Sequence, residues 1–195
     1  MTRTITGIAA ALALASALAC ASDKPTEPRE VRIPLFDRSS ADNNLGTHLN
    51  GDNENPPRPT QAQGQAIFRI SDDGQSVDYK LIAANIDNAF MAHIHLGPVG
   101  VNGPIVEWLF PSTAPVAGPA GAGRFDGVLA SGTFTAANLV GPLAGHPLSE
   151  LISAMRSGGA YVNVHTNDGV APTNTGPGDF PGGEIRGQLA APGKM

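Results

Sequence analysis

The chain of 195 residues contains little cysteine and little positive charge. Its one cysteine, Cys20, excludes a disulfide within the chain and a zinc site built from several thiolates. The 12 Lys and Arg residues are outnumbered by 17 Asp and Glu, and the net charge of −5 leaves no basic surface suited to nucleic acid. Any metal site therefore has to use histidine, carboxylate or backbone oxygen ligands.

Long apolar runs are also rare, and the longest is ITGIAAALALASALA at residues 5–19. It is shorter than the roughly 20 residues that a membrane-spanning helix needs. A short apolar stretch followed by small residues is typical of a secretory signal. The sequence thus predicts a signal peptide at residues 1–19 and an extracytoplasmic protein.

The end of this stretch, SALAC, resembles a bacterial lipobox, in which the cysteine is lipidated and becomes the mature N-terminus. This resemblance implies a membrane anchor at Cys20 and a place in the bacterial cell envelope. Ordinary cleavage after Ala19 or Ala21 is the alternative, and it would give a secreted protein. Residues 20–44 are polar and carry three prolines, which predicts a flexible tether. We expect the folded domain at 45–191 and a short tail at 192–195.

Short alternating segments separated by glycine and proline dominate the rest of the chain. Residues 64–71 and 76–86 alternate around the turn sequence DDGQ, which predicts a β-hairpin. Further strands are expected at 90–96, 104–110, 123–135, 160–166 and 183–189. This pattern predicts an all-β fold, an antiparallel Greek-key sandwich or barrel of the immunoglobulin or superoxide dismutase kind.

One helix is expected within residues 146–159. Leu148, Leu151, Ile152 and Met155 recur at helical spacing, and Pro147 and Gly158 suit the two ends. Its apolar stripe predicts a lid over one end of the sandwich.

Four motifs in order resemble the CHRD domain, the module named for the repeats of chordin. They are LNGDNENPP (49–57), AHIHLGPVGVNGPIV (92–106), ELISAMRSGGAYVNVHT (150–166) and GGEIRGQL (182–189). The resemblance implies a β-rich extracytoplasmic domain and leaves its biochemical activity open. A weaker likeness links the HIH and VNVHT segments to the copper/zinc superoxide dismutases.

The HIH segment predicts a metal site. Residues i and i+2 of a strand share one face, so His93 and His95 project together. His165 lies on the face of its own strand opposite to Val162 and Val164. If the two strands are neighbours, three imidazoles meet, and such a set without thiolate suits copper or zinc. Solvent-exposed histidines, or histidines that fix loops, are the alternative.

Carboxylates near these motifs are candidates for supporting roles. Asp168 and Asp179, in the long segment after His165, are candidates for a fourth ligand. Glu54 and Glu184 are candidates to orient the imidazoles, because carboxylates often bond to the second nitrogen of a metal-binding histidine. Surface ion pairs are the alternative for Glu54 and Glu184.

Three functions follow from these observations. The first is a non-catalytic extracytoplasmic module that binds copper or zinc at His93, His95 and His165. The second is a metal-free adhesion or interaction domain for a surface protein or glycan. The third, ranked last, is a dismutase-like redox enzyme, since only His48 and His146 remain as further histidines.

Overall fold

The structure, a computed structural model, describes residues 43–112 and 121–190. The predicted signal peptide 1–19, the lipidation site Cys20, the tether up to residue 42 and the tail 192–195 lie outside the described residues. No helix in the part of the chain that is described reaches the length and hydropathy of a membrane span.

The described ranges form strands and short helices in the order expected from the alternating segments. The strands are β1 (Asn44–Asn50), β2 (Gln63–Ile70), β3 (Ser76–Asp87), β4 (Ala89–Leu96), β5 (Ile105–Phe110), β6 (Arg124–Thr135), β7 (Ala160–Thr166) and β8 (Ile185–Leu189). The helices are α2 (Leu148–Ser157) and three 3-10 turns, η1 (Gly51–Asn53), η2 (Ala136–Asn138) and η3 (Gly141–Leu143).

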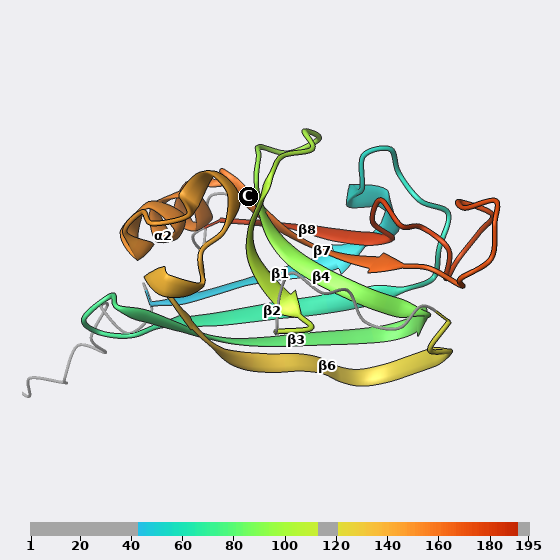
Figure 1. The fold of residues 1–195 in the computed structure, drawn as a ribbon, viewed down its shortest axis with the longest axis horizontal. Coiled ribbons are helices and arrows are strands. Elements are labelled where there is room, and N and C mark those ends of the chain that lie inside the picture. Colours follow the sequence, from blue (N-terminus) through green and yellow to red (C-terminus); the bar gives the residue numbers. More distant parts are fainter. Residues whose placement is uncertain (1–42, 113–120, 191–195) are drawn as a thin grey trace, which may run out of the picture. The chain divides into compact units, whose positions relative to one another are not determined.

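All eight strands belong to one antiparallel sheet with the order β5-β4-β7-β8-β1-β2-β3-β6. The sheet folds over, so that β4, β7 and β8 face β2, β3 and β6 across the interior (Figure 1). The two end strands, β5 and β6, contact each other and nearly close the sheet into a barrel. The chain passes from β3 to β4 and from β5 to β6 without pairing these strands, as in Greek-key connections. The predicted all-β class is confirmed.

The core fills the space between the two halves of the sheet. In β2, Ala66, Phe68 and Ile70 point inward and are nearly fully buried, while the intervening side chains are exposed. In β3, Val77 and Leu81 do the same from the opposite arm of the predicted hairpin. This alternation is expected for a strand with one face buried in the core and the other exposed to solvent.

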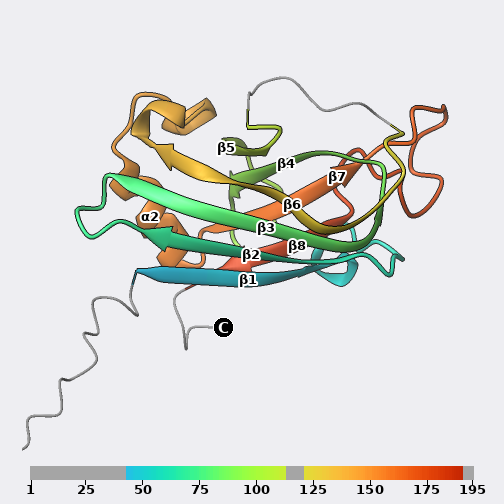
Figure 2. The ribbon, with the colours of Figure 1, turned by 90° about the horizontal axis from the view of Figure 1, so that it is seen from below.

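The helix α2 packs against β7 and β8 at one end of the strands (Figure 2). Its buried residues are the four predicted ones, Leu148, Leu151, Ile152 and Met155. Gly158 ends the helix with φ of 84°, a left-handed conformation that glycine adopts without strain.

Strand β1 was not expected as a strand, although the folded domain was expected to begin at its second residue. Leu45, Thr47 and Leu49 alternate with exposed side chains, but the two leucines alone give a weak apolar signal. The strand is central to the sheet nevertheless, because β1 joins β2 to β8.

Candidate functional site

Three imidazoles meet on the outer face of the sheet, where β4 and β7 pair. His93 and His95 come from β4, and His165 comes from β7. One nitrogen from each ring can be chosen so that all three lie within 4.8 Å of one another. Nδ1 of His93 lies 3.2 Å from Nε2 of His165. The pairing of β4 with β7 therefore gives the convergence that the HIH and VNVHT segments predict.

The hydrogen bonds of the rings determine which nitrogen atoms are available. Nδ1 of His95 donates to the carbonyl oxygen of Gly103 at 2.9 Å, and Nδ1 of His165 donates to that of Pro181 at 2.8 Å. A carbonyl oxygen can only accept, so each Nδ1 carries the proton and each Nε2 keeps its lone pair. The Nε2 atoms of His93 and His95 are buried and have no hydrogen-bond partner among the described residues.

Burial keeps all three imidazoles neutral. It lowers the pKa of His93 to about 2, with His165 and His95 adding to the effect. Burial also lowers the pKa of His165 to about 4, against the opposing hydrogen bond to Pro181, and it lowers the pKa of His95 as well. A neutral imidazole is the form that binds a metal, so no proton has to be removed from these rings at neutral pH.

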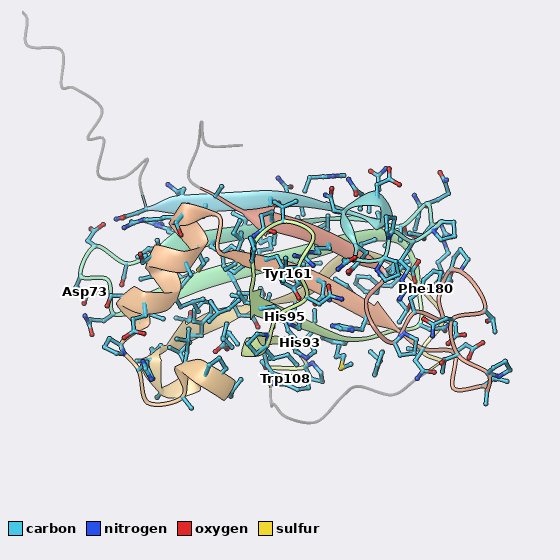
Figure 3. All side chains as sticks on the ribbon, turned by 90° about the horizontal axis from the view of Figure 1, so that it is seen from above. Asp73, His93, His95, Trp108, Tyr161 and Phe180 are labelled. Carbon is cyan, nitrogen blue, oxygen red and sulfur yellow. The ribbon has the colours of Figure 1, made fainter. Side chains whose placement is uncertain are left out.

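Aromatic side chains enclose the histidines. The ring of Trp108, on β5, stands edge-on to His93 with centroids 4.2 Å apart. The ring of Tyr161 stacks on His95 with centroids 4.8 Å apart and an angle of 7° between the planes. Phe90 meets His165 edge-on at 6.5 Å. Figure 3 shows Trp108, His93, His95 and Tyr161 as a continuous group.

A row of polar residues continues from His93 across the outer face. Strand pairing places His93 beside Asn163 on β7, and Asn163 beside Arg186 on β8. Oδ1 of Asn163 lies 3.0 Å from Nε2 of His165. All of these side chains are buried, in contrast to the exposed polar residues on the outer face of β2.

Glu54 reaches this row from the segment after η1. Burial raises the pKa of its carboxyl to about 7, while a backbone hydrogen bond from Asn55, the charge of Arg186 and a hydrogen bond from Asn163 oppose the rise. A Cβ at Gly183 would overlap Oε1 of Glu54 and lie 2.9 Å from Nδ2 of Asn163, so only glycine fits there. Glu54 thus contacts the histidines indirectly, through the Asn163 amide.

Arg186 holds the loop 97–104 over the site. Its guanidinium lies 3.3 Å from the centroid of the Tyr161 ring. It donates to the carbonyl oxygens of Pro98 and Val101 and to the side chain of Asn102 at 2.9–3.2 Å. The side chain is only 1% exposed, so these contacts replace its hydration.

The other predicted carboxylates bond to loop groups. Oδ1 of Asp168 accepts from the backbone of Val170 at 2.8 Å, and Oδ2 of Asp179 accepts from both the backbone and the hydroxyl of Thr175. Glu184 is fully buried and accepts from Thr60, Thr166 and Gly178. No carboxylate joins the cluster of three histidines in the described part of the chain, and whether any of these residues assists a metal stays a prediction.

The remaining histidines lie elsewhere. His48 is exposed on β1, and His146 is exposed before α2, where it pairs with Glu150. Neither belongs to the histidine cluster. The cluster accordingly offers three imidazoles, fewer than the set that the dismutase likeness would require.

Sequence reasoning did not identify Trp108 or Arg186 as part of this site. Trp108 lies in an apolar run that reads as an ordinary strand, and Arg186 alternates with buried residues as an exposed arginine would. Tyr161 and Asn163 alternate with Val162 and Val164, and the structure places both on the face of His165.

The chemistry of the site fits a transition-metal ion. Nitrogen lone pairs that are buried without a partner are costly unless something occupies them, and a metal ion bound by all three rings would do so. Nε2 of His95 is an available ligand atom, since its Nδ1 is bonded to a loop carbonyl. Nε2 of His165 could also be a ligand, but an ion would replace its contacts with Nδ1 of His93 and Oδ1 of Asn163. Such backbone bonds also fix the ring orientation, as is usual around metal-binding histidines.

Comparison with known proteins gives one family match. The model of the CHRD domain matches residues 45–189. This range includes all eight strands except Asn44, the first residue of β1. A comparison with curated proteins finds no match for the chain.

Proposed function

The chain belongs to the CHRD domain family, and we propose that it is an extracytoplasmic binding module that holds one copper or zinc ion at His93, His95 and His165. The observation that carries the proposal is the burial of three neutral imidazoles, two of which have an Nε2 atom without a partner among the described residues. A set of structural histidines would use these atoms in hydrogen bonds, because buried polar groups rarely go unpaired.

Loop contacts support a binding role over a purely structural one. His95 and His165 each use one nitrogen to hold a loop, and the other nitrogen points into the cluster. This division of roles is the one that a metal ligand needs, with one nitrogen for the ion and one for orientation.

The proposal also places the protein in the bacterial cell envelope, anchored by lipid on Cys20. The lipobox-like sequence SALAC supports this localisation. Metabolic labelling with palmitate tests it, and labelling that persists in Cys20→Ala would contradict the anchor.

Titration of the purified protein with Cu(II) or Zn(II) tests the metal site. Trp108 is the only tryptophan of the chain, and its contact with His93 makes its fluorescence a local probe. We expect one equivalent of Cu(II) to quench this emission. The double variant His93→Ala/His95→Ala should lose tight binding, because two of the three ligands are gone.

Two other histidines provide matched controls. His48→Ala and His146→Ala also remove imidazoles, but from exposed positions outside the cluster. They should bind Cu(II) and Zn(II) as the wild-type protein does. Equal affinity of the double variant and the wild type would overturn the metal-site proposal.

A metal-free interaction domain is the second candidate, and exposed valines favour it. Val99 and Val101, in the loop 97–104, are 77% and 49% exposed, and Val170, in the loop after β7, is 64% exposed. Exposed apolar residues on loops can contact a protein partner. This candidate predicts no stoichiometric metal after native purification and a partner captured by cross-linking that is lost in Val99→Ser/Val101→Ser.

A further inference from the structure

Met91 lies on the same face of β4 as the two histidines of that strand. Residues 91, 93 and 95 alternate with Ala92 and Ile94, which are fully buried in the core. A β-bulge at Phe90 precedes Met91, and the strand pairing then sets Met91 directly opposite His165. Directly paired residues of an antiparallel sheet have Cβ atoms about 4.5–5.5 Å apart on one face. Met91 thus stands beside the third histidine of the cluster.

The burial of Met91 is not explained by the hydrophobic core. Its side chain is half-buried, but it belongs neither to the core nor to the partly buried residues that pack against it. Other partly buried apolar side chains, such as Leu96 on the same strand, do pack on the core. Met91 therefore packs on the histidine side of the sheet.

The three rings have no charged ligand beside them in the described part of the chain. No carboxylate joins the cluster among residues 43–112 and 121–190, and Asp179 and Glu184 are bonded to loop groups. Trp108, Tyr161 and Phe90 instead give the cluster an aromatic enclosure. Uncharged nitrogen ligands in dry surroundings favour an ion of low charge, and a thioether is a soft ligand that favours Cu(I).

We propose that Met91 supplies a thioether ligand beside His93, His95 and His165, and that this ligand makes the site selective for Cu(I). The proposal rests on the metal-site function given above and specifies its ion. The unbranched methionine side chain has the freedom to bring its sulfur to an ion held by the rings. Its role is selectivity: the imidazoles alone bind Cu(II) and Zn(II), whereas the sulfur adds affinity for Cu(I).

Competition with a chromogenic Cu(I) chelator under anaerobic, reducing conditions tests this role. We expect Met91→Leu to lower the Cu(I) affinity by roughly tenfold or more. Its Zn(II) affinity should equal that of the wild type, because zinc prefers nitrogen and oxygen in such a site. Met155→Leu is the matched control, since Met155 is buried in α2 within the core, and it should leave both affinities unchanged.

Each outcome separates the two proposals. Wild-type protein that binds neither Cu(I) nor Zn(II) would overturn the metal site itself. Wild-type binding of both ions with no change in Met91→Leu would leave the histidine site standing and overturn the role of Met91. X-ray absorption of the Cu(I)-loaded wild-type protein gives a readout independent of any variant, and a first shell of nitrogen without sulfur would also overturn it.

Discussion

Strands β2 and β7 bury their side chains in different ways. In β2 every second side chain is buried, and the others, including Arg69, face solvent. In β7 all seven residues are buried. The inner faces of both strands are apolar, so the difference lies in the outer face of β7, where Tyr161, Asn163 and His165 lie beneath loops.

This difference distinguishes the inner face of the sheet, which stabilises the fold, from the outer face of β7, which carries the candidate site. An apolar inner face stabilises the fold through burial alone. A buried polar outer face costs free energy unless each of its groups is paired. Loop carbonyl oxygens pair one nitrogen each of His95 and His165, whereas Nε2 of His93 and Nε2 of His95 are among the buried atoms without a partner in the described part of the chain.

Substitution of one arginine on each outer face should give the largest contrast. Arg186→Leu removes the donors to Pro98 and Val101 and leaves these carbonyl oxygens unpaired, so we expect it to lower the free energy of unfolding by about 3 kcal/mol. Arg69→Leu, on the outer face of β2, should change it by less than about 0.5 kcal/mol. Urea unfolding measures both, and equal effects would mean that the two outer faces do not differ.

Metal addition should give the next largest effect. Free Cu(II) or Zn(II) at 100 times its dissociation constant should raise the free energy of unfolding by about 2.7 kcal/mol, because the ion binds only the folded protein. His93→Leu should show no such rise, since the ring and its partnerless nitrogen are gone. His48→Leu, on the outer face of β1, should keep the full rise. Urea midpoints measured with and without metal check this, and stabilisation that persists in His93→Leu would contradict it.

Local patterns predicted most of the fold. The hairpin expected at 64–71 and 76–86 appears as β2 and β3, because alternation and a DDGQ turn are both short-range signals. The helix expected within 146–159 appears as α2, because its apolar stripe and terminal glycine also lie within one segment. Strand β1 was missed since its alternation rests on only two leucines.

The candidate site depends on contacts that no local pattern contains. The alternation of HIH predicted the shared face of His93 and His95, but the meeting with His165 needs the pairing of β4 with β7, far apart in the chain. The loop carbonyls of Gly103 and Pro181, which fix the rings, carry no signal in their residue types. Proximity in sequence to His165 made Asp168 a ligand candidate, whereas its side chain closes a turn with Val170.

A carboxyl group interrupts the apolar inner face, and its substitution should give the smallest effect on stability. Glu107, on β5, pairs with the core residue Ile94 and is 4% exposed. Burial raises the pKa of its carboxyl from 4.5 to about 8. The folded protein therefore binds a proton that the unfolded chain releases above pH 4.5, and stability falls as the pH rises from there until the folded carboxyl ionises near pH 8.

Replacement of this carboxyl by an amide isolates its contribution to the pH dependence. Between pH 6 and pH 7 the wild-type protein should lose about 1 kcal/mol more than Glu107→Gln, because the amide does not titrate. Glu54 and the three histidines also titrate, but they are present in both proteins and cancel in the difference. If the urea midpoints of Glu107→Gln and the wild type fall by the same amount from pH 6 to pH 7, Glu107 is already ionised in the folded protein. The inner face at β5 would then be more hydrated than the inner face at β2.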